Sequence, residues 1–322
     1  ILSDSYWDYK NIFTTYIPGV MISFAIFIGL NYEKNFNLFR SIITRTFPIA
    51  VILGVIFYTF FDQTRYTYGA SRLASPIFFF ILAFPFLKKN HQLLVLFISV
   101  FSIFIDPAWR TNVLRIFICF GFIIFYYIFS LKKFFINFIC TIVLIIPLLF
   151  LYTGMSGKFD VFSYLSTDNQ GITTGNTRTF LYIEVFDSLQ DKNINTLMGG
   201  GANSGYRTNV FFDSTVSNLA ERERYRSEVR FLNTLNQSGI IGVILDMLII
   251  FIPAFLAINR SNNNFSKLLG LYLCLSWIIY FLEIPLSLNL IYFIHYLIIG
   301  LCLNNSFRDS NNEEIKLLFK KL

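Results

Sequence analysis

Arginine is concentrated in one long polar segment of this sequence, where its spacing suggests chemistry. Arg178 precedes the glycine run Gly199-Gly200-Gly201, and Arg224 and Arg230 lie on either side of Glu228. The planar guanidinium group pairs bidentately with phosphate oxygens, so several arginines in one segment favour a site for phosphate-linked groups. A carboxylate beside them could position or deprotonate a hydroxyl group. Glu228 is therefore the candidate residue for binding a substrate hydroxyl group.

Each of these features also has a simpler interpretation. The run Glu221-Arg222-Glu223-Arg224-Tyr225-Arg226 is typical of a solvated helix with ion pairs, and a single outward arginine can serve lipid headgroups. The glycine run predicts either a nest of amides for an anion or a flexible turn. The segment has no Asp-x-Asp pair to bind a bridging metal, so we expect metal-independent chemistry with no cofactor. His91 and His295 both lie outside it.

The rest of the chain must place this segment at a membrane. Of its 322 residues 55% are hydrophobic and only 14% are charged, and the mean hydropathy is +0.59. Apolar runs recur at intervals of about 25 to 30 residues, which indicates an all-α polytopic membrane protein. We predict about nine transmembrane helices, of which the third and fourth are short. They are centred near Ile22, Ile52, Phe80, Ile98, Phe120, Val143, Ile249, Leu275 and Ile294.

Some polar and reactive residues fall inside the predicted spans. Asp246 and Glu283 would be costly there unless paired, and helix-to-helix pairing is the simplest expectation for both. All four cysteines lie in apolar runs, so we assign them no chemistry and no disulfide. The chain opens at Ile1 without an initiator Met or a signal-peptide pattern, and we expect further spans upstream.

Basic residues divide the predicted connections into two faces. One face is rich in lysine and should be cytoplasmic; its basic residues are Lys34, Arg40, Arg45, Lys88, Lys89, Lys132, Lys133, Arg260, Lys267, Arg308, Lys316, Lys320 and Lys321. The opposite face carries the arginine-rich segment. We divide the chain into an N-terminal bundle of about six helices (1–153), a large outward loop with short helices (154–238), a C-terminal bundle of about three helices (239–305) and a cytoplasmic tail (306–322).

An enzyme on the outward face has no nucleotide supply, so its substrate must bring its own activated bond. A lipid-linked diphosphate sugar is such a substrate. Arginines placed where charge develops would stabilise the departing diphosphate, and Glu228 would orient or deprotonate the acceptor. The residues predicted to bind the diphosphate are Arg65, Arg110, Arg178, Arg224 and Arg230, with Arg178 and Glu228 as the catalytic pair.

Three blocks of the sequence resemble the O-antigen polymerase and O-antigen ligase superfamily of bacterial membrane glycosyltransferases. The first joins Arg178-Thr179-Phe180-Leu181-Tyr182 to Leu197-Met198-Gly199-Gly200-Gly201, the second runs from Phe231-Leu232-Asn233 to Gly242, and the third is Trp109-Arg110-Thr111-Asn112. The resemblance implies the helical architecture of lipid-dependent (GT-C-like) glycosyltransferases and undecaprenyl-diphosphate-linked oligosaccharides as substrates. It also implies a chain-length regulator as partner, the bacterial inner membrane as location and a periplasmic active face. We expect no nucleic-acid partner.

The ligase branch typically has a histidine followed by asparagine where this chain has Glu228-Val229, so the resemblance favours the polymerase branch. Transfer to a lipid core by a ligase remains an alternative, since it uses the same donor chemistry. A flippase for the same lipid-linked sugar is an alternative from another class. It predicts charged residues along the spans and two repeated halves, whereas intramembrane charge is sparse here and one long loop breaks any symmetry.

Overall fold

The structure is a computed structural model, and it confirms that the protein is an all-α membrane protein by helix content and apolarity. It describes residues 22–60, 70–106, 110–129, 131–155, 179–192, 194–201, 204–208, 223–224, 227–283 and 290–320. Of these described residues 83% are helical. Four helices in the described part are long and apolar enough to cross a membrane: Tyr32–Phe60, Thr111–Ile128, Lys133–Thr153 and Arg230–Asn259. Shorter apolar helices cover Ala70–Leu82, Lys89–Ile105, Asn264–Tyr280 and Leu290–Leu303.

The long helices expose apolar side chains, as helices surrounded by lipid do. On α9 (Lys133–Met155) Phe134 and Leu148 are exposed, and on α11 (Arg230–Asn259) Leu245 and Phe255 are. In water such surfaces would be unfavourable, so they fit a lipid environment. The number of spans, the extent of the outward loop and the four-part division of the chain stay predictions.

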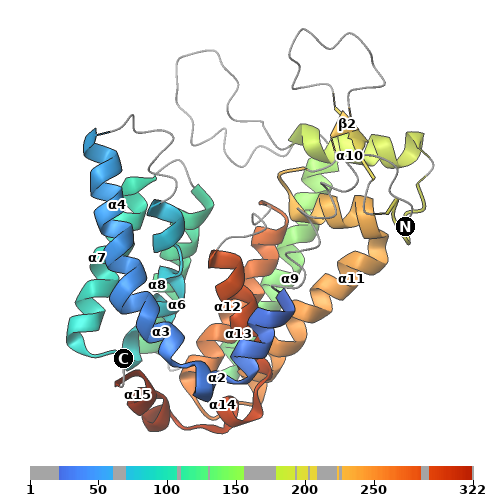
Figure 1. The fold of residues 1–322 in the computed structure, drawn as a ribbon. Coiled ribbons are helices and arrows are strands. Elements are labelled where there is room, and N and C mark those ends of the chain that lie inside the picture. The colour runs from blue at the N-terminus through green and yellow to red at the C-terminus, as the bar shows by residue number, and fades with distance from the viewer. Residues whose placement is uncertain are drawn as a thin grey trace. The chain divides into compact units, whose positions relative to one another are not determined.

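The chain, whose helices and strands are labelled in Figure 1, divides into two compact units. Unit 1 comprises Ile1–Tyr16, Thr141–Ile249 and Leu275–Ile284, and unit 2 comprises Ile17–Cys140, Ile250–Cys274 and Pro285–Leu322. The boundaries fall inside α9, α11 and α12 (Asn264–Tyr280).

Unit 2 begins with a nearly continuous helical stretch. After helical residues 22–30 come α2 (Tyr32–Asn35), α3 (Asn37–Ser41), the π-helix η1 (Ile42–Thr46) and α4 (Phe47–Phe60). The π-helix directly precedes Pro48, which has no N–H and whose ring crowds the carbonyl four residues before it, in Thr44. The wider turn relieves that crowding, so a proline inside an apolar span is tolerated here.

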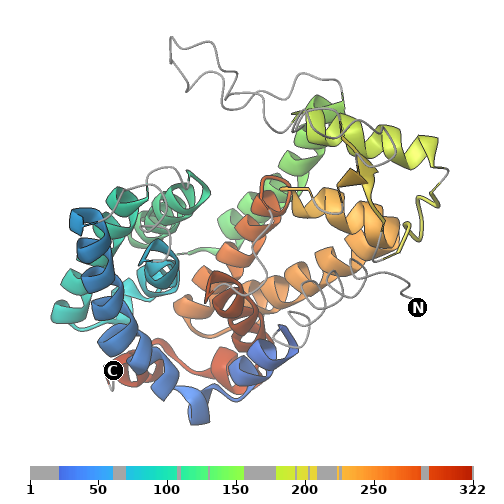
Figure 2. The same cartoon turned by 45° about the horizontal axis from the view of Figure 1, so that its top comes forward.

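The core of unit 2 is the short helix α6 (Ile77–Leu82), in which all six residues are buried. It packs against α7 (Lys89–Ile105) and α8 (Arg110–Phe129), and Figure 2 shows these helices side by side. Phe79 stacks on Phe39 with ring centroids 4.7 Å apart, and Phe78 stacks on Tyr272 of α12 at 4.6 Å. Stacked aromatic rings contribute beyond their buried area, so α6 anchors its neighbours.

The C-terminal part of unit 2 comprises α13 (Leu290–Leu303), α14 (Asn305–Asp309) and α15 (Asn312–Lys320). Gly300 of α13 packs so closely on residues 22–30 that a Cβ there would lie 2.2 Å from the carbonyl oxygen of Ile26. The ring of Phe319 packs edge-on against Phe265 at 5.1 Å, which docks the predicted tail onto the bundle. The tail is therefore helical and packed rather than an extended segment.

Unit 1 contains α10 (Thr179–Asp191), a two-stranded antiparallel sheet and the first part of α11. Strands β1 (Tyr206–Arg207) and β2 (Glu223–Arg224) pair with Tyr206 opposite Arg224. α10 is tied to the end of α12, because the hydroxyl of Tyr182 donates a 2.7 Å hydrogen bond to the carbonyl oxygen of Phe281. These elements surround the start of α11, where the sequence predicts the site.

Candidate functional site

Helix α11 breaks at Gly239, whose φ of 63° and ψ of −162° are open to glycine alone among the residues. A break leaves carbonyls without partners at the end of the first part and N–H groups without partners at the start of the second. The glycine turn satisfies both sets. Gly200 and Gly201 donate their N–H groups to the carbonyls of Asn236 and Gln237, at 2.8 and 2.9 Å. On the other side of the break, the N–H groups of Ile240 and Ile241 donate to the carbonyls of Thr196 and Leu197, at 2.9 and 3.2 Å.

The glycine run therefore supplies the backbone hydrogen bonds that the helix break leaves unmade. The amides that a nest would offer to an anion are engaged, since Gly199 also donates its N–H group, to the carbonyl of Asn195 at 2.6 Å. Of the two interpretations left open for Gly199, Gly200 and Gly201, these hydrogen bonds favour the turn. Close backbone approach explains Gly199, because a Cβ there would lie 2.5 Å from the backbone of Gln237, while Gly201 has a positive φ of 86° and open space.

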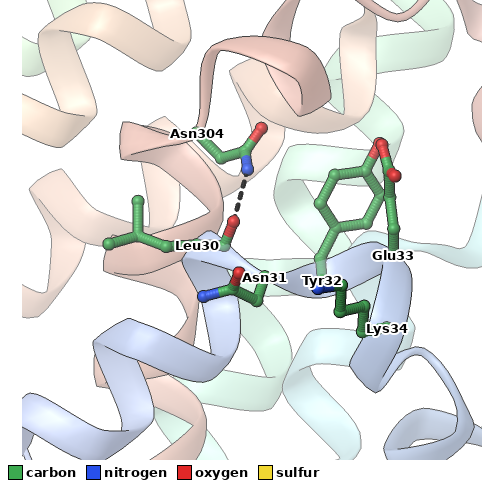
Figure 3. A pocket seen from close by; sticks show the side chains of 6 residues that line it. All are labelled: Leu30, Asn31, Tyr32, Glu33, Lys34 and Asn304. Carbon is green, nitrogen blue, oxygen red and sulfur yellow. Dashed lines mark hydrogen bonds between the residues drawn. The ribbon is translucent and has the colours of Figure 1, made fainter.

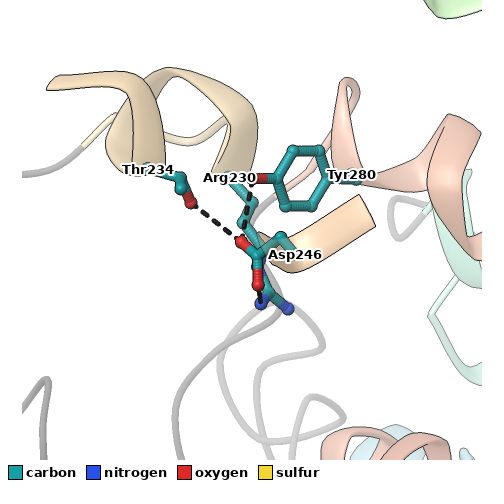
Figure 4. Close-up of polar contacts among 4 residues, drawn as sticks. All are labelled: Arg230, Thr234, Asp246 and Tyr280. Atoms are coloured by element: carbon teal, nitrogen blue, oxygen red, sulfur yellow. Dashed lines mark hydrogen bonds and ion pairs between the residues drawn. The ribbon is translucent and has the colours of Figure 1, made fainter. Parts of the chain in front are cut away.

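Asp246 lies in α11 beyond the break and joins three side chains (Figure 4). Its Oδ1 pairs with Nη2 of Arg230 at 2.8 Å, while its Oδ2 accepts from the Thr234 hydroxyl at 3.2 Å and the Tyr280 hydroxyl at 2.9 Å. The side chains of the ion pair are each 18% exposed. The expected pairing of Asp246 is confirmed, with partners before the break and on α12.

Aromatic rings enclose this ion pair. The guanidinium of Arg230 lies over the ring of Tyr280, 5.2 Å from its centroid, and Trp277 stacks on the same tyrosine at 5.0 Å. Phe231 stacks on Phe281 at 4.4 Å. A cation over an aromatic face is stabilised by the ring quadrupole, so Arg230 is held from two directions. Its charge is balanced by Asp246, which makes it first of all an architectural residue.

Two asparagines fix the chain at the start of α11. The side chain of Asn233 accepts a hydrogen bond from the N–H group of Ser227 at 2.7 Å and donates to its carbonyl at 2.9 Å. Asn236 is buried, and it donates to the carbonyl of Ser204 at 2.7 Å. Glu228 follows the clamped Ser227 and is exposed. The structure thus holds the backbone on both sides of Glu228 while its carboxylate faces outward.

Tyr206 links the small sheet to this region. It is only 1% exposed, and its hydroxyl has no hydrogen-bond partner in the described part of the chain. Burial raises the pKa of Tyr206 to about 12; the charge of Arg224 opposes the rise, and the carboxylates of Glu184 and Glu228 add to it. Arg224, Glu184 and Glu228 are therefore all within electrostatic range of one buried hydroxyl.

The predicted site residues divide into three groups. Arg224, Glu228 and Arg230 all belong to unit 1; Arg224 and Glu228 both act on the hydroxyl of Tyr206, whereas Arg230 pairs with Asp246. Arg110 is the first residue of α8 in unit 2, and its side chain is not described. Arg65 and Arg178 lie outside the described residues.

Sequence reasoning missed the roles of Asn233, Asn236 and Tyr280. The two asparagines stand three residues apart after Phe231, a spacing that places both near one face of a helix and could have indicated a clamp. Tyr280 comes from a distant segment and gave no signal. In the described ranges no group of three or more His, Cys, Asp or Glu side chains could hold a metal ion. Metal-independent chemistry stays a prediction.

Two further features lie in unit 2. A cavity of about 170 Å³ is lined by Leu30, Asn31, Tyr32, Glu33, Lys34 and Asn304 (Figure 3). It is smaller than ligand pockets usually are, and Asn304 closes one side by donating to the carbonyl of Leu30. The Sγ atoms of Cys140 and Cys274 lie 3.1 Å apart as two contacting thiols, a pairing that the apolar positions of the cysteines did not predict.

Comparison with protein-family models, curated protein sequences and solved structures returns no match for this chain.

Proposed function

We propose that this protein polymerises lipid-linked oligosaccharide repeat units at the periplasmic face of a bacterial inner membrane. It transfers the growing chain from undecaprenyl diphosphate to an incoming lipid-linked unit, as in O-antigen or related polysaccharide synthesis. The observation that carries the proposal is the exposed Glu228, which follows the clamped Ser227 and lies two residues before the apolar helix that begins at Arg230. The sequence blocks that resemble the polymerase and ligase superfamily support it.

The proposed reaction breaks the bond between the sugar and the diphosphate oxygen and forms a bond from the same carbon to the acceptor hydroxyl. Negative charge then grows on the leaving diphosphate, and guanidinium groups placed there lower the barrier. The residues proposed for this role are Arg65, Arg110, Arg178, Arg224 and Arg230, of which Arg230 also pairs with Asp246. No metal is needed when cations of the protein supply the charge.

Glu228 orients the acceptor hydroxyl or takes its proton. An exposed carboxylate is accessible to a sugar, and the clamp by Asn233 keeps it in one place while the substrates change. Positioned acid–base groups contribute about 10²- to 10⁴-fold to the rate. A neutral amide of the same shape removes that contribution and leaves the fold.

The test is deletion of the gene followed by complementation, with the surface polysaccharide separated on a gel. Wild type should restore a ladder of chain lengths, whereas Arg178→Ala and Glu228→Gln should leave a single repeat unit attached. Two matched controls at exposed residues, Asp191→Asn at the end of α10 and Arg45→Ala in η1, should restore the ladder. Protein levels in the membrane are measured for every variant.

The pattern after deletion separates the proposal from its alternatives. Loss of the ladder with one repeat unit retained supports a polymerase. Loss of every attached unit indicates a ligase, and accumulation of the lipid-linked unit on the cytoplasmic face indicates a flippase. A normal ladder made by both Arg178→Ala and Glu228→Gln would remove these residues from the site.

A further inference from the structure

Arg115 is a buried cation in unit 2 for which the described chain supplies no counter-charge. It lies in the second turn of α8 and is 4% exposed. Its Nε and Nη1 atoms are buried without hydrogen-bond partners, and no described carboxylate forms an ion pair with it. It makes a cation–π contact with Phe78, whose ring centroid lies 6.0 Å from the guanidinium carbon. A ring face at that distance compensates only a small part of a buried charge.

A second orphaned group lies on the same face of the helix. Asn112 precedes Arg115 by three residues and is 1% exposed, and its Oδ1 atom has no partner. Its Nδ2 atom donates to the hydroxyl of Ser102 on α7 at 3.1 Å. Rotation of this amide by 180° would let Ser102 donate to Oδ1 and turn both amide hydrogens toward a ligand. An anion beside Arg115 would thus meet donors from two residues.

Two other arginines of the protein have hydrogen-bond or charge partners that compensate for burial of the guanidinium. Arg308 in unit 2 is 7% exposed, but its guanidinium donates to the carbonyl of Arg260 and to the side chain of Asn305. It therefore satisfies the end of α11 and fastens α14. Arg230 in unit 1 has Asp246. Arg115 has neither a carbonyl nor a carboxylate in the described residues, although burial of an unpaired charge is strongly unfavourable.

We propose that Arg115 and Asn112 form a second anion site, between α6, α7 and α8, which binds the phosphate of a lipid headgroup or of a lipid-linked diphosphate. Nε and Nη1 lie on different edges of the guanidinium. One carboxylate or one phosphate covers a single edge with two oxygens, so both edges are covered by two phosphate groups, as in a diphosphate, or by one phosphate together with a second polar group of a headgroup. Arg115 is about 6 Å along the helix axis from Thr111, where the apolar span begins, so it lies close to one end of that span. The site does not depend on sugar transfer.

The test uses the purified full chain in neutral detergent, with thermal unfolding as the readout. The probes are inorganic pyrophosphate and phosphatidylglycerol in mixed micelles, each compared with the neutral detergent micelles alone, which carry no phosphate. At saturation, at least one probe should raise the Tm of wild type by about 5 °C or more. A response to pyrophosphate alone identifies a diphosphate as the ligand, and a response to phosphatidylglycerol alone identifies a phospholipid headgroup. The variant Arg178→Ala removes any contribution from the proposed transfer site.

Arg115→Gln should abolish the rise, and its Tm without ligand should equal or exceed that of wild type, because an uncompensated charge has been removed. Arg308→Gln is the matched control: it should lower the Tm without ligand and keep the response. A wild type that responds to neither probe, or an Arg115→Gln variant that still responds, would overturn the site. If the Arg115→Gln protein does not accumulate in the membrane, the Arg115→Lys variant tests the site instead. It should bind at least 10-fold more weakly, and unchanged affinity would overturn the site.

Discussion

Arg230 at the start of α11 and Arg115 near the start of α8 both lie at one end of an apolar helix, yet their surroundings differ. The groups around Arg230 all have partners. Asp246 balances its charge, the ring of Tyr280 covers the guanidinium, and the glycine turn hydrogen-bonds to the backbone groups at the break of α11. Around Arg115 the backbone is an uninterrupted helix, but the described residues leave the charge without a partner.

The difference separates two uses of arginine near a membrane. A compensated arginine holds elements together, and its removal should cost stability. An uncompensated one is maintained at a cost to stability, and its removal should cost binding.

The largest loss of stability is expected for Gly239→Ala at the break of α11. A Cβ there would lie 2.3 Å from the carbonyl oxygen of Leu197, and the φ of +63° adds strain. Together they should lower the free energy of unfolding by at least about 4 kcal/mol. Gly201→Ala has a positive φ but open space and should cost about 1 kcal/mol. Gly121→Ala, in open space within α8, should be neutral or stabilising. Equal effects at all three positions would show that the close packing at Gly239 does not stabilise the helix break.

Asp246→Asn is expected to come next, because it leaves Arg230 without its counter-charge. Loss of one partner of a largely buried pair costs about 3 kcal/mol, measured by unfolding in detergent. Replacing both residues, by adding Arg230→Met, should recover part of the loss, since no unpaired charge then remains. A double variant as unstable as the sum of the two single variants would show that the pair is not coupled.

Tyr206 predicts a loss of stability in alkaline solution. Its pKa is about 12 in the folded protein, against 10 for an ordinary tyrosine, so the folded state holds the proton more tightly. The contribution is complete below pH 10 and is lost as the pH rises from 10 to 12, up to about 2.5 kcal/mol. Tyr206→Phe should flatten this part of the stability curve relative to wild type. Parallel curves for the two proteins would contradict the assignment.

The smallest effect on stability is expected for Glu228→Gln. The carboxylate is exposed, so the change should stay within about 0.5 kcal/mol of wild type while the polysaccharide ladder is lost. This residue then behaves as Arg115 should, with function lost and stability kept. A variant that lost the ladder only because it unfolded would place Glu228 with Arg230 among the architectural residues.

The helices could be predicted from the sequence because their signal is local. Eight of the nine predicted spans coincide with an apolar helix, and the helices near Phe80 and Ile98 are short; the predicted span centred near Ile22 lies only partly within the described residues. The pairing of Asp246 was also predictable, since an acid inside a span needs a partner wherever that partner comes from. Its actual partner Tyr280, 34 positions away, depends on how α12 packs on α11.

The glycine run shows why the rest could not be predicted. Positive φ and small size suit both an anion nest and a turn, so the residue types alone could not decide between them. Only the neighbouring carbonyls of Asn236 and Gln237 show where the amides point. The same holds for arginine, because one residue type serves a helix junction at Arg230 and lacks a protein partner at Arg115.

The measurement that tests the proposed function most directly is the sidedness of the two predicted faces. In a background with all four cysteines replaced, single cysteines are introduced at exposed Arg207 of unit 1 and at exposed Lys88 of unit 2. Intact spheroplasts are then treated with a membrane-impermeant maleimide, with permeabilised cells as the control. Transfer from a lipid-linked donor at the periplasmic face predicts that position 207 is labelled in intact spheroplasts and that position 88 is labelled only after permeabilisation. The reverse pattern would place the arginine-rich segment in the cytosol and contradict the proposed polymerase.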